Sequence, residues 1–151
     1  MTQVSAVTYA TDALGITDQT SFLLLDLRDP EEYEFWRIRE AINYPAANIG
    51  RDKIIPELYR FKNQANKLIV IYMGDERKGT HAAMLMAEKG YENVFLLSGG
   101  IESFNEEFHS LVEGRDVPKP RKLILEEEQK KKMATSAAIK ARSQAKKMDR
   151  F

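Results

Sequence analysis

Residues 67–79 of this chain, KLIVIYMGDERKG, decide its fold. Residues 68–72 form an apolar run rich in β-branched and aromatic side chains, which is typical of a strand buried on both faces of a parallel sheet. Residues 80–90 carry apolar side chains at helical spacing and end at Gly90, a residue type that favours helix ends. Free backbone N–H groups and the helix dipole converge where such a strand meets the next helix. We therefore look for chemistry in the connecting loop, residues 73–79.

The surrounding sequence alternates between strand and helix patterns. A helix is expected to begin at Asp29-Pro30-Glu31-Glu32, which offers an N-cap, a proline at the first helical position and acidic residues in the first turn. Further strands are expected at residues 22–26, 42–45 and 94–97, and further helices at residues 52–61 and 101–108. This alternation predicts an α/β fold with a parallel-rich sheet and helices on both faces.

Three segments in this order resemble the rhodanese family. They are LLLDLRDPEEYEFWRIREAINYP (residues 23–45), IVIYMGDERKG (residues 69–79) and GYENVFLLSGGIESF (residues 90–104). They look like the family's opening signature, its active loop, and its closing strand with a Gly-Gly turn and final helix. The resemblance covers about residues 21–108 and implies the rhodanese-like fold.

Compared with the family, the chain lacks the residue that performs the family's reaction. Catalytic rhodaneses begin the loop with a cysteine, whereas Met73 occupies that position and the chain contains no cysteine. A thioether has no proton to lose and cannot become a thiolate nucleophile. Glu76 stands where the family has glycine, and Lys78, or Arg77 if the register shifts by one, stands for its arginine. The expected degenerate loop therefore comprises Met73, Gly74, Asp75, Glu76, Arg77, Lys78 and Gly79, and we expect a pseudoenzyme.

Within the family, the chain resembles the centrosomal and ciliary rhodanese domains of the Joubert-syndrome group. The shared features are the loop Asp75-Glu76-Arg77, the segment Phe61-Lys62-Asn63 and the closing turn at residues 93–100. This resemblance implies a cytoplasmic protein of the cilium, axoneme or centrosome. Its expected partners are axonemal or centrosomal proteins, with tubulin as one candidate.

Two pairs of residues near the loop draw attention. In the family an Asp-x-Arg pair braces the core, and we carry that role to Asp26 and Arg28, because a charge at the end of a buried strand needs a partner. Trp36 and Arg37 replace the family's Gly-His, so that a large aromatic side chain and a charge stand on a surface that is normally small. Trp36 is either a partner-binding residue, with Arg37 as a further candidate beside it, or a side chain that caps the edge of the core.

The composition narrows the kinds of site and of partner that we expect. Without cysteine the chain has neither disulfides nor thiolate zinc sites, and its two histidines, His81 and His109, occupy unrelated places. We therefore expect no metal and no cofactor. No stretch approaches the ~18 consecutive apolar residues of a membrane span, so no membrane partner is expected.

The net charge of zero hides two segments of opposite charge. From Lys119 onward there are eleven basic and four acidic residues, a net charge of +7, and the rest of the chain carries −7. Pro118 and Pro120 mark the division, because proline continues neither a helix nor a strand ladder. We therefore expect an N-terminal arm (1–20), a rhodanese-like domain (21–117), and a linker with a basic, Ala- and Lys-rich helical tail (118–151).

The tail lacks glycine and proline from residue 123 onward and has high helix propensity. Four alanines and a methionine at 4-3-4-3 spacing form a seam of mostly small residues that lets a partner surface approach closely; they are Ala134, Ala138, Ala141, Ala145 and Met148. A lone soluble helix of this kind is marginal, so the tail is either frayed in solution or ordered on an acidic surface. Its candidate partner-binding residues are Lys130, Lys131, Lys132, Ala138, Ala141, Lys146 and Lys147.

Three functions remain open from the sequence. The first is a non-catalytic structural or adaptor protein of the axoneme or centrosome, without a small-molecule substrate. The second is a small-anion sensor or a residual sulfurtransferase- or phosphatase-like enzyme, because the loop at residues 73–79 still presents backbone N–H groups with Arg77 or Lys78 beside them. Nucleic-acid binding by the tail ranks last, because no aromatic residues interleave with its lysines.

Overall fold

The computed structural model describes residues 17–148. The chain divides into two compact units, Met1–Val117 and Pro118–Phe151. Most of the expected N-terminal arm lies outside the described residues. Its last part is a turn in which the backbone N–H of Thr20 donates to the carbonyl of Thr17 at 3.0 Å.

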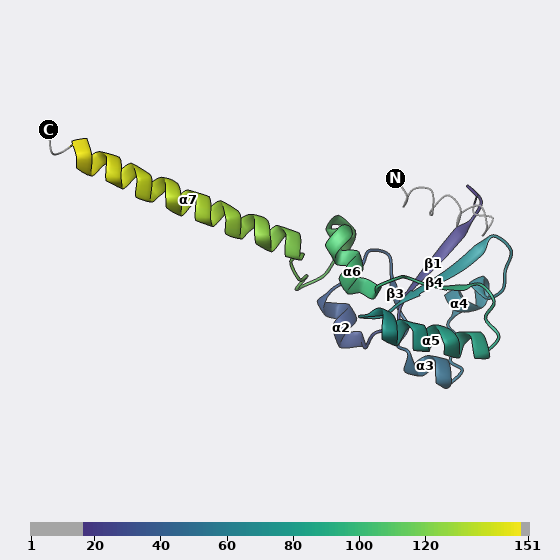
Figure 1. The fold of residues 1–151 in the computed structure, drawn as a ribbon. Helices are drawn as coiled ribbons and strands as arrows, with labels where there is room; N and C mark the ends of the chain where they lie inside the picture. The colour runs from purple at the N-terminus through teal and green to yellow at the C-terminus, as the bar shows by residue number, and fades with distance from the viewer. Residues whose placement is uncertain (1–16, 149–151) are drawn as a thin grey trace. The chain divides into compact units, whose positions relative to one another are not determined.

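A four-stranded parallel sheet forms the centre of the first unit, in the order β3-β1-β4-β5 (Figure 1). Because all four strands run the same way, their carboxyl ends lie at one edge of the sheet. The long central pair is in register from Ser21 opposite Lys67 to Asp26 opposite Tyr72. The strands are β1 (Ser21–Asp26), β3 (Ile42–Asn43), β4 (Lys67–Tyr72) and β5 (Val94–Leu96).

One face of the sheet is covered by α3 (Ala47–Gly50), α4 (Pro56–Phe61) and α5 (Glu76–Glu88) (Figure 1). Alternate side chains of β1 and β4 point to this face, as the two-residue period of a strand requires. They pack against one apolar side chain or more from each helix, and this cluster contains Leu23, Leu25, Ile69, Ile71, Ile49, Leu58 and Met86.

The other face is covered by α2 (Pro30–Phe35), α6 (Gly100–Glu107) and a small antiparallel pair. That pair joins β2 (Arg37–Ile38) to β6 (Val112–Glu113), which follows the 3₁₀ turn η1 (His109–Leu111). The cluster on this face contains Tyr72, Ile38, Ala41, Ile101 and Val112. The structure therefore confirms the predicted parallel sheet with helices on both faces.

Several predicted boundaries were wrong. The helix expected at residues 52–61 begins at Pro56, with Ile55 in extended conformation, because a residue that precedes proline is disfavoured in the helical region. The strand expected at residues 42–45 ends at Asn43. Asp29 occupies the N-cap position of α2, but its side chain makes no capping hydrogen bond.

Two aromatic residues at the ends of the expected strand 22–26 and the expected helix 101–108 lie at the margin of the core. Phe22 belongs to β1 but is 55% exposed, because it points to the second face of the sheet near the amino ends of the strands. Phe108 follows α6 instead of ending it and is 47% exposed, although its ring still contacts that of Phe104.

The second unit is dominated by α7 (Arg121–Met148), a helix of 28 residues. Its first turns are tied to the preceding segment by an ion pair of 3.0 Å between Lys119 and Glu127. Every side chain at residues 121–147 is exposed, including the seam residues Ala138 and Ala141. Within residues 17–148, no helix, α7 included, combines the length and the apolar character that crossing a membrane requires.

Candidate functional site

The degenerate loop is shorter than the sequence suggested, because α5 begins at Glu76 and not at residue 80. Asp75 is the N-cap, and its Oδ1 accepts a hydrogen bond from the backbone N–H of Lys78 at 2.9 Å. This cap satisfies one of the free donors of the first turn and starts the helix early. Only residues 73–75 remain as a connection, and residues 76–79 form the first turn of α5.

The Gly99-Gly100 turn holds this connection in place. The backbone N–H of Ile101 donates to the carbonyl of Met73 at 3.0 Å. Gly100 has a φ of 69°, and a Cβ there would lie 2.7 Å from the carbonyl oxygens of both Met73 and Gly74. Only glycine allows this approach without strain, so the turn after β5 fixes where the degenerate loop lies.

An open groove of about 760 Å³ lies beside the loop. It is formed by the loop, the α3 region and one side of α5, which lies next to α3 (Figure 1). The groove is apolar over much of its lining, since it is walled by Ala46, Ala47, Ile49, Met73, Ala82 and Leu85. Its volume falls within the range of about 300–1,000 Å³ typical of ligand clefts.

The charged residues of the groove belong to the first turns of α5. Arg77, Lys78 and His81 line it together with Asp75. Glu76 does not line the groove, because its Oε1 accepts a hydrogen bond from the Ser98 hydroxyl at 3.3 Å. The rim therefore carries more positive than negative charge.

The groove has no cysteine thiolate, the nucleophile of catalytic rhodaneses. Met73 supplies a thioether at the position of the nucleophile, and no cysteine exists elsewhere in the chain. In the part of the chain that the structure describes, no cluster of three or more His, Asp or Glu side chains is placed to hold a metal ion. What the groove offers is an apolar surface with cations on its rim, which suits binding.

Asp26 and Arg28 meet at the carboxyl edge of the sheet, both almost fully buried. Nε and Nη2 of Arg28 donate to the carboxylate of Asp26, the latter at 2.8 Å, and the Tyr72 hydroxyl donates to Asp26 Oδ2 at 2.7 Å. The backbone N–H of Ile38 in turn donates to the Tyr72 hydroxyl at 3.2 Å. In the described residues, no buried side-chain nitrogen or oxygen lacks a hydrogen bond, so the network carries its buried charges without an unpaired group.

Trp36 and Arg37 make contacts inside the domain. The carbonyl of Trp36 accepts a hydrogen bond from Arg28, whose guanidinium carbon lies 5.4 Å from the indole centroid. Arg37 lies over the Tyr33 ring at 4.9 Å and pairs with Glu113 at 3.5 Å. Trp36 packs against the cluster on the second face of the sheet, so a role at the edge of the core explains its contacts.

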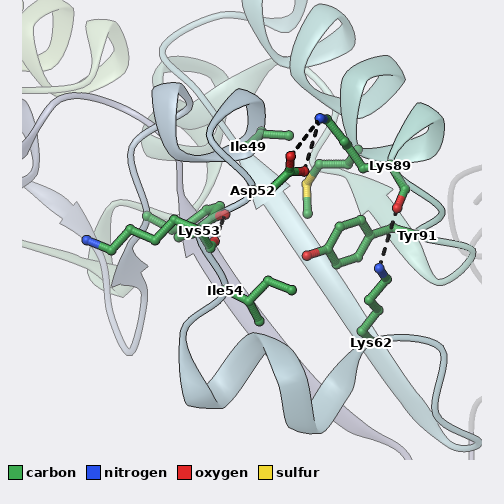
Figure 2. Close-up of a pocket in the computed structure, with 9 residues that line it drawn as sticks. Ile49, Asp52, Lys53, Ile54, Lys62, Lys89 and Tyr91 are labelled. Atoms are coloured by element: carbon green, nitrogen blue, oxygen red, sulfur yellow. Dashed lines mark hydrogen bonds and ion pairs between the residues drawn. The ribbon is translucent and has the colours of Figure 1, made fainter.

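A second and smaller pocket of about 40 Å³ lies on the other side of Ile49. Figure 2 shows Lys89 reaching Asp52, at 3.0 Å, and Lys62 reaching the backbone carbonyl of Lys89. The Nζ of Lys62 also lies 4.4 Å from the centroid of the Tyr91 ring. Lys62 and Lys89 thus both make contacts within the fold. These contacts connect the segment after α3 to the end of α5.

Sequence reasoning missed the apolar side of the groove. Ala46 and Ala47 follow Pro45 as a pair of small residues, and Ala82 and Leu85 lie one turn apart on α5. These residues gave a signal only for helix packing. Their common surface depends on α3 lying beside α5, which follows from the order of strands in the sheet.

The comparisons with known proteins agree with this geometry. The family model "Rhodanese-like domain" matches residues 9–107. The chain is 40% identical over 89 residues to "Centrosomal protein of 41 kDa" of Xenopus tropicalis and 39% identical over 89 residues to the human protein of that name. Each match covers 58% of this chain and 24% of the relative, so the chain spans about a quarter of the length of these curated relatives.

Solved structures show the same fold. The solution NMR structure of the rhodanese-like domain from the Anabaena Alr3790 protein matches with a TM-score of 0.51 and 22% identity, over 72% of this chain and 75% of that one. A crystal structure of thiosulfate sulfurtransferase from Pseudomonas aeruginosa matches with a TM-score of 0.50 and 24% identity, over 66% of this chain and 18% of that one. With the family model covering well over half of its length, the chain belongs to the rhodanese-like domain family.

Proposed function

We propose that this chain is a non-catalytic adaptor of the centrosome or ciliary axoneme. Its rhodanese-like domain docks to microtubule-associated proteins, and its basic helix α7 lies on an acidic surface such as that of tubulin. The observation that carries the proposal is the position of Met73, which puts a group that cannot ionise at the head of an apolar groove. A binding surface therefore occupies the place of an active site.

Two further observations support the setting and the mode of docking. The relatives that share about 40% of the domain's residues are named as centrosomal proteins. Helix α7 exposes every side chain at residues 121–147 and belongs to a segment with a net charge of +7. An isolated helix is marginal in water, so an acidic partner surface would stabilise α7 both by charge and by packing against its alanine seam.

A small-anion sensor or a residual enzyme is the second candidate. It is favoured by Arg77 and Lys78, which line the groove near the amino end of α5, where the helix dipole is positive. The apolar walls argue against it, because an anion that leaves water for such a surface loses hydration that two side chains at the rim do not replace. The proposed adaptor uses the same cations for a partner.

Imaging of the tagged full chain in ciliated cells tests the proposed function. We expect a signal at centrosomes or along axonemes, and we expect a variant with Lys130, Lys131 and Lys132 changed to Glu to lose most of it. Changing Arg39, Arg51 and Arg60, which are exposed on the domain, to Glu alters the net charge equally and is the matched control. A diffuse signal for the unaltered chain would contradict the proposal.

The same chain is also assayed for thiosulfate–cyanide sulfurtransferase and for phosphatase activity. No turnover above that of a heat-killed sample is expected, because no thiolate is present. Turnover that disappears when Arg77 and Lys78 are both changed to Ala would instead establish the enzyme.

A further inference from the structure

The groove combines two kinds of surface that rarely suit the same small ligand. Its floor and walls are aliphatic, with Met73 between the alanines of α3 and the Ala82 and Leu85 side chains of α5. An aliphatic side chain of a partner would lose water against this surface, and burial of that kind is worth roughly 25 cal/mol per Å². The groove therefore selects an apolar anchor.

The rim of the groove favours negatively charged groups of a partner. Among the described residues, neither Arg77 nor Lys78 takes part in an ion pair, and both line the groove with His81. The single carboxylate of the rim, Asp75, already accepts the backbone N–H of Lys78. The positive end of the 13-residue helix α5 lies at the same place, so carboxylates beside the anchor are attracted.

The charged rim and the apolar floor each argue against one other occupant. Helix α7 of a second copy has nine basic and three acidic residues, and its lysines would meet Arg77 and Lys78 at the rim. A free phosphate or sulfate would match the cations but would leave the aliphatic floor uncovered. An acidic segment with an apolar side chain matches both surfaces at once.

We infer that the groove between α3 and α5 binds a partner segment in which an aliphatic side chain is flanked by acidic residues. The aliphatic side chain inserts beside Met73 and Ala82, and the flanking carboxylates pair with Arg77 and Lys78. This inference rests on the proposed docking function and names the chemistry of the partner for this site. Arg77 and Lys78 then determine which segment binds, and Met73 takes part as packing surface.

The groove is unusually well suited to methyl NMR, because its walls carry the methyl groups of Met73, Ala46, Ala47 and Ala82. The full chain, labelled on Ala and Met methyl groups, is titrated with a synthetic peptide that has two leucines between pairs of glutamates. We expect saturable shifts of these groove methyls. The alanine methyls of α7 report any separate contact of the acidic peptide with the basic helix, and their shifts should not saturate at the peptide concentrations that saturate the groove.

Matched peptides and variants make the test specific. Replacing the leucines by alanines, or the glutamates by lysines, should weaken binding at least tenfold. Changing Arg77 and Lys78 together to Glu should do the same, whereas changing Arg39 and Arg60, which are exposed and lie outside the groove lining, to Glu alters the net charge equally and should leave binding unchanged. The methyl spectrum of each variant reports whether it is folded.

Three results would overturn the inference. Shifts confined to the α7 alanines would show that the peptide only meets the basic helix, and equal binding of the alanine peptide would show that no apolar anchor is taken. Saturable groove shifts with inorganic phosphate alone would make the groove a small-anion site. The imaging experiment uses no peptide, so the proposed setting and the groove can fail separately.

Discussion

At the scale of single residues, burial raises the pKa of three tyrosine side chains. Burial raises the pKa of Tyr44 to about 12, with smaller contributions from Tyr91 and Asp52. Burial likewise raises the pKa of Tyr91, and of Tyr72, where the Asp26 carboxylate adds to the effect. Tyr44 is only 2% exposed, and its hydroxyl donates to the carbonyl of Lys53, which holds the segment between α3 and α4.

Because the pKa of Tyr44 is higher in the folded state, its contribution to stability is complete below pH 10, the ordinary tyrosine value. Between pH 10 and 12 the unfolded chain releases the proton and the folded chain retains it, so this contribution falls as the pH rises. Changing Tyr44 to Phe should therefore cost about 1 kcal/mol at pH 8 for the lost hydrogen bond, and the gap to the unaltered chain should narrow above pH 10.

Urea unfolding from pH 8 to 11.5, followed by circular dichroism, measures this gap. Tyr59 is 75% exposed, so changing it to Phe is the matched control and should leave the pH dependence unchanged. Deprotonation of lysines affects all three proteins alike. A gap between the Tyr44→Phe variant and the unaltered chain that stays constant with pH would show that Tyr44 titrates normally in the fold.

At the scale of elements, the candidate site depends on a turn that lies far from it in sequence. Gly100 brings the start of α6 against the backbone of residues 73 and 74, where a side chain would overlap two carbonyl oxygens. Gly74 lies on the other side of the same contact, and a Cβ there would meet nothing within 4 Å. A Cβ would therefore find space at Gly74 but not at Gly100, although both glycines belong to turns.

Changing Gly100 to Ala should destabilise the domain by about 2 to 4 kcal/mol, because alanine is strained at positive φ and its Cβ would push the degenerate loop away. Changing Gly74 to Ala should alter stability by less than about 1 kcal/mol, since its space is open. Thermal and urea unfolding of the two variants compare them directly. Equal destabilisation would mean that the Gly99-Gly100 turn does not position the loop.

Elements formed by local sequence could be predicted, and contacts between distant segments could not. The apolar run of residues 68–72 and the spacing of residues 80–90 gave the strand and the helix on either side of the loop, and family resemblance gave Met73. The early start of α5 depends on the Asp75 cap. We read Asp75-Glu76-Arg77 as a side-chain motif and therefore missed that α5 begins at Glu76.

The pair Asn63 and Asn93 shows the same limit more clearly. Both lie in segments that supported the family resemblance, but nothing in the sequence indicated that they meet. The backbone N–H of Asn63 donates to Asn93 Oδ1 at 2.9 Å, and Asn93 Nδ2 donates to the carbonyls of Phe61 and Lys67. Thirty residues separate the two asparagines, and only the pairing of β4 with β5 brings them together.

At the scale of the whole molecule, charge is divided between the two units. The unit Met1–Val117 carries −7 and the unit Pro118–Phe151 carries +7. A neutral chain of this kind has little long-range attraction to a polyanion as a whole, whereas its basic unit alone has a strong one. Binding through α7 should therefore be steeply dependent on salt, as the Debye length falls from about 10 Å at 0.1 M to about 3 Å at 1 M.

Charge and docking can be separated on α7 itself. Changing Ala138 and Ala141 to Glu places two carboxylates on the alanine seam, and changing Ser136 and Ser143 to Glu places two on the opposite side of the helix with the same net charge. If α7 docks along its seam on an acidic partner, the first variant should bind polymerised tubulin about tenfold more weakly than the second, or about 1.4 kcal/mol. Cosedimentation of the full chain with microtubules measures both, and circular dichroism checks that helix content is retained.

All four side chains replaced are exposed in the free chain, so neither pair should disturb the fold. Equal losses in the two variants would mean that the tail acts as a flexible polycation, for which the positions of the charges along the helix do not matter.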